Sequence, residues 1–242
     1  RRFREFIAAS AGITALVEPL RELAPPGHPA LVFWPGYNPH FFGPRPPELA
    51  RRRALGIADD TLVVVYPGNV HTANRDEVRS LYLAVCLLNR RGVPALLLRT
   101  GDDFVPVLDH TLNEVARHVV ALGPQADQSG VADALALADV LVQPGRAGPF
   151  NDYRVPSKLP EFFVTGRPVL LPASNLGRYV RPEEDAIVLQ RGDALEIAHR
   201  LAGLAADAPA RERLGTAAVA FARRHFQWPE IAARVQAFLA TR

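Results

Sequence analysis

From Thr61 onward, short apolar runs alternate with longer segments whose apolar positions follow a helical spacing. The runs are continuous, which is typical of strands that are buried on both faces. Six such strands are predicted, at Leu62–Tyr66, Ala95–Arg99, His118–Leu122, Val140–Gln143, Pro168–Leu171 and Ala186–Leu189. Helices are predicted between most of them and, at the end of the chain, over Ala194–Ala206, Pro209–His225 and Pro229–Ala240. The pattern indicates an α/β fold, with a parallel sheet covered by helices on both faces.

The residues before Thr61 are less regular. They predict helices over Arg1–Ser10, Val17–Leu23 and Glu48–Leu55, and short strands at Ile13–Leu16 and Leu31–Trp34. The proline-rich segment Phe41–Pro47 is expected to be extended, as an interdomain linker is. It divides the chain into residues 1–46 and 47–242.

The composition is that of an ordinary globular protein, with 48% hydrophobic and 22% charged residues among 242. The formal net charge of +3 comes from a small excess of arginine. Because no Lys/Arg run is interleaved with aromatic residues, nucleic acid is not an expected partner. The positive balance leaves room for peripheral contact with an anionic membrane surface.

The single cysteine, Cys86, excludes an intrachain disulfide bond and fits the reducing cytosol. No apolar stretch reaches the length of a membrane-spanning helix. We therefore expect the protein to be located in the cytoplasm, where peripheral contact with the inner face of the membrane is a further option. The sequence begins at Arg1 and contains no methionine, so we expect a piece of a longer chain.

The loop over residues 148–161 connects a predicted strand to a short helix, where α/β proteins bind ligands. Ser157 is placed to cap this helix, and the free N–H groups of its first turn, with the cation Lys158, suit a phosphate. Glu161 has the acceptor oxygens to hold two vicinal hydroxyls, as on a ribose. The pattern indicates a nucleoside diphosphate site. The alternative is a capped helix with a solvated Lys–Glu pair.

A second loop follows the first strand of the alternation. Gly68 permits close backbone approach, and Asn74 and Glu77 have the spacing of a capping box at the start of a helix. Neither a dinucleotide-binding glycine pattern nor a Walker loop is present, so a plain tight turn is the alternative. Gln125, after the third strand, is positioned to contact a base edge or to lie in an exposed loop.

Other chemistries find little support in the sequence. The seven histidines show no spacing typical of a zinc site, so no metal is expected. We interpret Asp102 and Asp103 as a turn, and we retain His71 as the one candidate histidine. A serine hydrolase is not supported, because no Gly-x-Ser-x-Gly motif is present.

The order of the motifs resembles the C-terminal half of a GT-B glycosyltransferase of the family 4 type. Trp34–Asn38 with Phe42–Pro44 resembles the crossing between the two domains of that family, and Tyr66–Asn69 its first donor-side loop. The remaining resemblances are Val119–Gly123, Ala136–Pro144, Pro156–Phe162, Gly166–Val169 and Phe226–Trp228. The resemblance implies a Rossmann-like sheet at residues 47–242, preceded in residues 1–46 by a remnant of the N-terminal domain.

The resemblance also implies a nucleotide-diphosphate sugar as donor, with no metal or other cofactor. Glu161 would hold the ribose hydroxyls. Ser157, Lys158 and the adjoining amides, including that of Leu159, would hold the diphosphate. Lys158 and Asp152 are the catalytic candidates.

The remaining implied contacts come from other loops. Gly68 and Asn69 would approach the phosphates or the sugar, the sugar would lie near Asn151 and Asp152, and Gly123 to Gln125 would contact the base. The missing N-terminal domain would bind the acceptor, which is a glycan, a lipid or a small molecule. The full-length protein is then a hexosyl- or glycosyltransferase, and the fragment alone is expected to be inactive.

Two departures from the family pattern affect these assignments. Tyr153 stands where the family usually has a glutamate, so Asn151 or Asp152 would replace it. The basic residues of the first loop are also missing, since Asn69 stands at the arginine position and Arg75 lies near the lysine position. Phosphate contacts are therefore expected from Arg75, Arg154 or Lys158. For Arg154, a solvated loop arginine is the alternative.

Two further interpretations remain. A nucleotide-sugar 2-epimerase half would need an acid/base pair, for which His71 and Asp152 are the candidates. A non-catalytic interaction domain would have kept the fold and lost the site. Tyr153 favours that alternative, whereas the presence of Ser157, Lys158 and Glu161 together counts against it.

Overall fold

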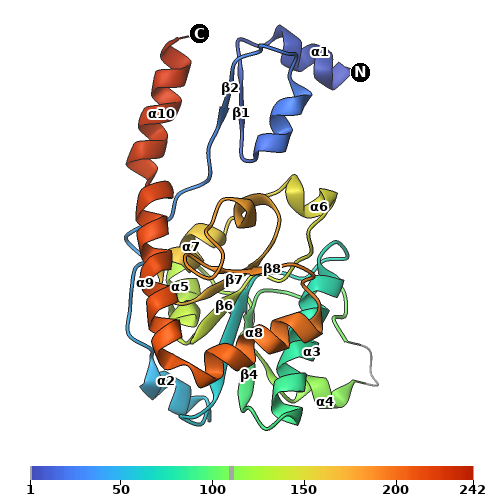
Figure 1. Cartoon of the computed structure of the whole chain (residues 1–242), viewed down its shortest axis with the longest axis vertical. Coiled ribbons are helices and arrows are strands. Elements are labelled where there is room, and N and C mark those ends of the chain that lie inside the picture. Colours follow the sequence, from blue (N-terminus) through green and yellow to red (C-terminus); the bar gives the residue numbers. More distant parts are fainter. Residues whose placement is uncertain (1, 109–111, 242) are drawn as a thin grey trace.

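A six-stranded parallel sheet forms the centre of the molecule (Figure 1). The computed structural model describes residues 2–108 and 112–241. The strand order is β5-β4-β3-β6-β7-β8. The strands are β3 (Leu62–Pro67), β4 (Ala95–Thr100), β5 (Val119–Ala121), β6 (Val140–Val142), β7 (Val169–Pro172) and β8 (Ile187–Leu189). All six strand predictions are confirmed, each to within one residue at either end.

Successive residues of each strand enter different hydrophobic cores. In β3, Val63 and Val65 belong to one buried cluster, whereas Leu62 and Val64 belong to the other. Because side chains alternate across a sheet, a strand with a core on each side needs apolar residues at every position. This double burial explains the continuous apolar runs of the sequence.

Helices cover both faces of the sheet. On one face, α3 (Arg75–Arg90) and α8 (Ala194–Ala206) pack against each other. On the other face lie α5 (Gln128–Ala136), α7 (Leu159–Val164) and α9 (Ala208–His225). The shorter elements are α2 (Leu49–Ala54), α4 (Asn113–Ala116), α6 (Pro149–Asp152) and the 3₁₀ helix η2 (Asn175–Arg178). Cys86 is buried among the residues of α3, as expected for a small core residue.

The strand order reverses beside β3. The chain continues from β3 to β4 on one side, whereas β6 pairs with β3 on the other. The loops that leave β3 and β6 therefore diverge at the carboxyl edge of the sheet. In open α/β folds this divergence creates the crevice in which ligands bind.

Residues 2–32 form a small unit that lies apart from the sheet (Figure 1). It contains α1 (Arg2–Ala9), β1 (Ile13–Ala15), the 3₁₀ helix η1 (Glu18–Leu23) and β2 (Ala30–Val32), with β1 and β2 paired in parallel. The predicted strand at Leu31–Trp34 is shorter than expected. Trp34 instead packs in an aromatic cluster with Tyr179, Phe221, His225 and Phe226.

The last helix, α10 (Trp228–Ala240), extends from the sheet toward this unit (Figure 1). Just before it, the Tyr37 amide donates to the Phe226 carbonyl at 3.2 Å. A side chain at Gly36 would come within 2.8 Å of the Phe226 oxygen. Residues 34–38 and 226–228 therefore pass side by side. Of the helices in the described residues, none is long and apolar enough to cross a membrane.

Candidate functional site

Lys158 lies beneath the loop that follows β3. Its ammonium donates to the Pro67 carbonyl and sits 4.2 Å from the centre of the Tyr66 ring. Gly68 has φ +129°, and a Cβ built on it would overlap the Lys158 Nζ atom. Glycine at position 68 therefore allows the loop after β3 to close over a cation supplied from the start of α7.

Burial and neighbouring cations weaken the charge of Lys158. Desolvation lowers its pKa to about 7, and the positive charges of Arg154 and Arg99 act in the same direction. Glu161, one helical turn later, opposes this shift. Three cations thus share one small region, an arrangement that attracts an anion.

The carboxyl group of Glu161 is half-buried and has no hydrogen-bond partner among the described residues. Burial raises its pKa to about 7, although the charge of Lys158 acts against the shift. Within residues 2–108 and 112–241, no hydrogen bond or ion pair holds this carboxyl. A half-buried carboxylate with free acceptor oxygens can receive hydroxyl donors from a ligand.

Arg99 supports the same loop from below. It is 3% exposed and donates to the Tyr82 hydroxyl at 2.9 Å, to Asp103 at 2.6 Å and to the Gly68 carbonyl at 3.1 Å. Its Nε atom has no partner in the part of the chain that the structure describes. Arg99 is not among the predicted site residues, because an arginine at the end of an apolar strand carries no local sign of such a role.

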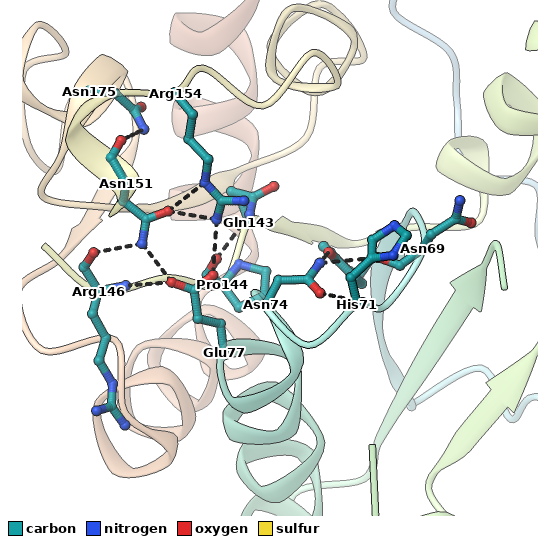
Figure 2. Close-up of polar contacts among 11 residues, drawn as sticks. Asn69, His71, Asn74, Glu77, Gln143, Pro144, Arg146, Asn151, Arg154 and Asn175 are labelled. Atoms are coloured by element: carbon teal, nitrogen blue, oxygen red, sulfur yellow. Dashed lines mark hydrogen bonds and ion pairs between the residues drawn. The ribbon is translucent and has the colours of Figure 1, made fainter. Parts of the chain in front are cut away.

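Asn69 and Asn74 hold the loop in shape. The Asp102 amide donates to the Asn69 side-chain oxygen at 2.8 Å. The Asn74 side chain donates to the Asn69 carbonyl at 3.1 Å and accepts from the His71 amide at 2.8 Å (Figure 2). Helix α3 begins at Arg75 with Asn74 at its N-cap position, as predicted, but the capping box is not formed, because the Asn74 side chain makes no capping bond to α3.

Glu77 instead reaches across to the loop after β6 (Figure 2). One carboxylate oxygen accepts from the Asn151 amide group at 2.6 Å, and the other accepts from Arg154 at 3.1 Å. Asn151 accepts in turn from Arg154 at 2.8 and 2.6 Å, and its carbonyl receives the Asn175 side chain at 2.7 Å. Arg154 is thus not a solvated loop residue.

The start of α7 differs from the prediction. Lys158 occupies the N-cap position, and the helix has no side-chain cap. Ser157 is exposed one residue earlier, so its predicted capping role is wrong, because the helix begins at Leu159. Leu159 itself is buried. Gly166 follows the helix with φ +78°, as predicted for a glycine that ends a helix.

The other predicted site residues have different surroundings. Arg75 is exposed at the start of α3 and pairs with Asp76 at 3.3 Å. Asp152 pairs with Arg178 at 2.7 Å. Tyr153 is 47% exposed, so it does not occupy the place of a buried carboxylate.

Two loop predictions concern the β4 and β5 side of the site. Gln125 donates to the carbonyls of Leu122 and Gly123, at 3.2 and 3.1 Å, and so holds its own loop. His71 stacks on the exposed Phe104 ring at 4.7 Å. Among the described residues, no group of three His, Cys, Asp or Glu side chains is arranged to hold a metal ion.

Known proteins resemble this chain in sequence. The sequence profile of the family described as Glycosyl transferases group 1 matches residues 61–207. D-inositol 3-phosphate glycosyltransferase of Thermobispora bispora is 28% identical over 232 residues, which cover 88% of this chain and 50% of the relative. The chain thus spans about half the length of this curated relative.

Solved structures share the fold. Sucrose-phosphate synthase of Thermosynechococcus elongatus superposes with a TM-score of 0.77 at 19% identity, covering 98% of this chain and 60% of the synthase. Anabaena HepE in complex with UDP-glucose gives the same TM-score of 0.77 at 16% identity, covering 98% and 66%. Both likenesses support the GT-B fold that the strand order indicates. With the profile matching more than half of its residues, the chain belongs to the glycosyl transferases group 1 family.

Proposed function

We propose that this chain binds a nucleotide-diphosphate sugar as the donor half of a retaining, metal-independent glycosyltransferase. The observation that carries the proposal is the presence of Lys158, half-buried under Gly68, beside the unbonded carboxyl of Glu161 at the point where β3 and β6 diverge. A cation and a free carboxylate there complement a diphosphate and a ribose.

The donor is held by groups from several loops. Lys158 and Arg154 attract the diphosphate, and the exposed Ser157 hydroxyl and the Leu159 amide are further donors toward it. Glu161 accepts from the ribose hydroxyls. Gly68 and Asn69 border the phosphates, and Gly123 with its positive φ of +71° shapes the turn beside the base.

The chemistry needs stabilisation of the departing diphosphate. In a front-face displacement, the acceptor oxygen bonds to the anomeric carbon as the carbon–oxygen bond to the diphosphate breaks. The acceptor proton passes to the diphosphate. Because Lys158 and Arg154 neutralise the charge that develops there, the reaction requires no metal ion. Asp152, held by Arg178, lies on the sugar side of this site.

The acceptor belongs to a part of the protein outside this chain. The curated relative is about twice as long as the segment it shares with this chain, which supports a second, acceptor-binding half. That acceptor is a glycan, a lipid or a small molecule, and a lipid acceptor would place the enzyme at the inner face of the membrane. By itself the 242-residue chain is expected to bind donor without transferring sugar. Transfer by the chain alone would contradict this.

The test is thermal unfolding in the presence of UDP, GDP, ADP, CMP or TDP, with EDTA throughout. UDP is the first choice, because HepE has been crystallised with UDP-glucose. A nucleotide at a hundredfold excess over its Kd stabilises the folded state by about 2.7 kcal/mol. We expect one nucleotide to raise the Tm and Glu161→Ala to abolish the shift. The control is Glu22→Ala, a substitution at an exposed glutamate of η1, which should keep the shift.

The absence of a shift with every nucleotide would refute donor binding and favour the non-catalytic domain. The epimerase interpretation finds no support in the geometry. Its candidate acid and base make no contact with each other, since Asp152 forms an ion pair with Arg178 and His71 stacks on Phe104.

A further inference from the structure

Glu77 is a carboxylate that this chain brings into the loop after β6 from a different element. It lies in the first turn of α3, and its side chain is 12% exposed. Besides Asn151 and Arg154, it accepts from the backbone amide of Arg146 at 3.4 Å. Both oxygens are therefore used, and every partner belongs to residues 146–154 (Figure 2). None of these contacts is with α3 itself, so the formation of that helix does not explain them.

The contacts fix one edge of the Arg154 guanidinium. Its Nε and Nη2 atoms donate to Asn151, and Nη2 also donates to Glu77. Its Nη1 group has no hydrogen-bond partner in the described part of the chain. The guanidinium carbon also lies 4.1 Å from the centre of the Phe150 ring, a favourable cation–π contact. Nε and Nη2 are therefore held, and the free edge of the group is Nη1 with both of its N–H donors.

Arg154 belongs to the same electrostatic region as Lys158, because its positive charge helps to lower the pKa of that lysine. Guanidinium groups bind phosphate through a rigid planar edge, so their orientation decides how many hydrogen bonds they form. At position 153, where a loop carboxylate would be expected, the chain has an exposed tyrosine. The carboxylate that contacts Asn151 and Arg154 of this loop is therefore Glu77, from α3.

We propose that Glu77 is a positioning residue for donor binding, which together with Asn151 holds Arg154 so that its free edge meets the diphosphate of the nucleotide sugar. This inference rests on the proposed function, since it assigns a role within the same site. Glu77 itself does not contact the donor.

Glu77→Gln is the appropriate variant, because it keeps the size of the side chain. A glutamine has one acceptor oxygen, so its NH₂ group must face a donor of either Asn151 or Arg154. Asp76→Asn is the matched control. It removes a carboxylate from the same turn of α3, but Asp76 is 73% exposed and contacts Arg75.

Calorimetry on the 242-residue chain measures its affinity for two ligands. One is the nucleoside diphosphate that raises the Tm in thermal unfolding, and the other is the corresponding nucleoside. We expect Glu77→Gln to weaken diphosphate binding about tenfold and to leave nucleoside binding unchanged, whereas Asp76→Asn stays within about twofold of wild type. In an Arg154→Ala background, Glu77→Gln should cause no further loss, because its effect passes through Arg154.

Two results would overturn the inference. One is an unchanged diphosphate affinity in Glu77→Gln. The other is an equal tenfold loss with and without Arg154, which would indicate general damage to the fold.

Amide hydrogen exchange provides a readout that needs no nucleotide. Glu77→Gln should increase exchange across residues 146–154, and Asp76→Asn should not. Increased exchange in a protein that binds no nucleotide would confirm that Glu77 orders the loop but refute both the donor site and the diphosphate role of Arg154. Unchanged exchange in a protein that does bind nucleotide would refute the inference alone.

Discussion

The Lys158 ammonium occupies the space that a side chain at position 68 would need. The two residues are far apart in sequence, yet each determines what the other can be. A glycine is required where the lysine rises toward the end of β3, and the lysine fills the volume that the glycine leaves.

Replacing Gly68 by alanine should therefore have two effects. The φ of +129° is unfavourable for alanine, and the added methyl group must displace the ammonium. We expect the free energy of unfolding to fall by about 1–3 kcal/mol and nucleotide binding to be lost. Urea unfolding and calorimetry measure the two effects. The matched control is Gly203→Ala within α8, where a Cβ meets nothing within 4 Å. It should stabilise the protein by up to about 1 kcal/mol, and equal losses in both variants would contradict this account.

Nucleotide affinity should depend on pH through Lys158. In the free protein its pKa is lowered to about 7, so the ammonium loses its proton as the pH rises above neutrality. A bound diphosphate favours the charged form, so binding takes up a proton. We expect the affinity for the nucleoside diphosphate to decrease between pH 6 and 9, as measured by calorimetry. In Lys158→Met the affinity should be weak at pH 6 and change little with pH. An affinity that is constant in wild type across this range would contradict the prediction.

Glu161 should make the stability of the free protein depend on pH. Burial raises its folded-state pKa to about 7, above the usual value, so the folded state binds the proton more tightly than the unfolded state does. The stability that this proton contributes is present at low pH and is lost as the pH rises toward 7. Unfolding by urea at pH 4.5 and 7.5 should show that wild type loses more stability than Glu161→Gln. An identical loss in the two proteins would show that Glu161 titrates normally.

Arg99 should contribute strongly to the stability of the folded protein. Arg99→Met removes the donors to Tyr82, Asp103 and the Gly68 carbonyl. We expect a loss of about 2–3 kcal/mol in the free energy of unfolding, because buried acceptors are left without a partner. Arg99→Lys should recover little, since one ammonium cannot reach partners on both edges of a guanidinium. Arg117→Met, at the exposed end of α4, should change stability by less than about 0.5 kcal/mol.

The sheet could be predicted from sequence because its signal is local. Double burial makes each strand a continuous apolar run, as in Leu62–Tyr66, and each helix a periodic one, as in Ala194–Ala206. The cap of α8 is equally local, since the Asp193 side chain accepts from the Glu196 amide at 2.8 Å, three residues along the chain.

The interior of the site could not be predicted in the same way. Asn74 and Glu77 have the spacing of a capping box, but each finds a better partner through the fold. Glu77 meets Asn151, 74 positions later, and no periodicity in the sequence indicates such a contact. Lys158, Glu161 and Arg154 could be chosen by residue type and loop position, whereas their orientations depend on tertiary contacts. Their roles toward a donor stay predictions.

The side-by-side passage of residues 34–38 and 226–228 has a mechanical consequence. The backbone bond from Tyr37 to Phe226 and the tight contact at Gly36 join the two segments into a neck. The N-terminal unit and α10 both continue from this neck. A rotation at the neck, relative to the sheet, would therefore move the two together as one rigid body. None of the contacts described for Lys158, Glu77 and Arg154 involves a residue of the neck. A rotation at the neck would therefore change none of those contacts directly, although Phe226 packs against Phe163 of α7.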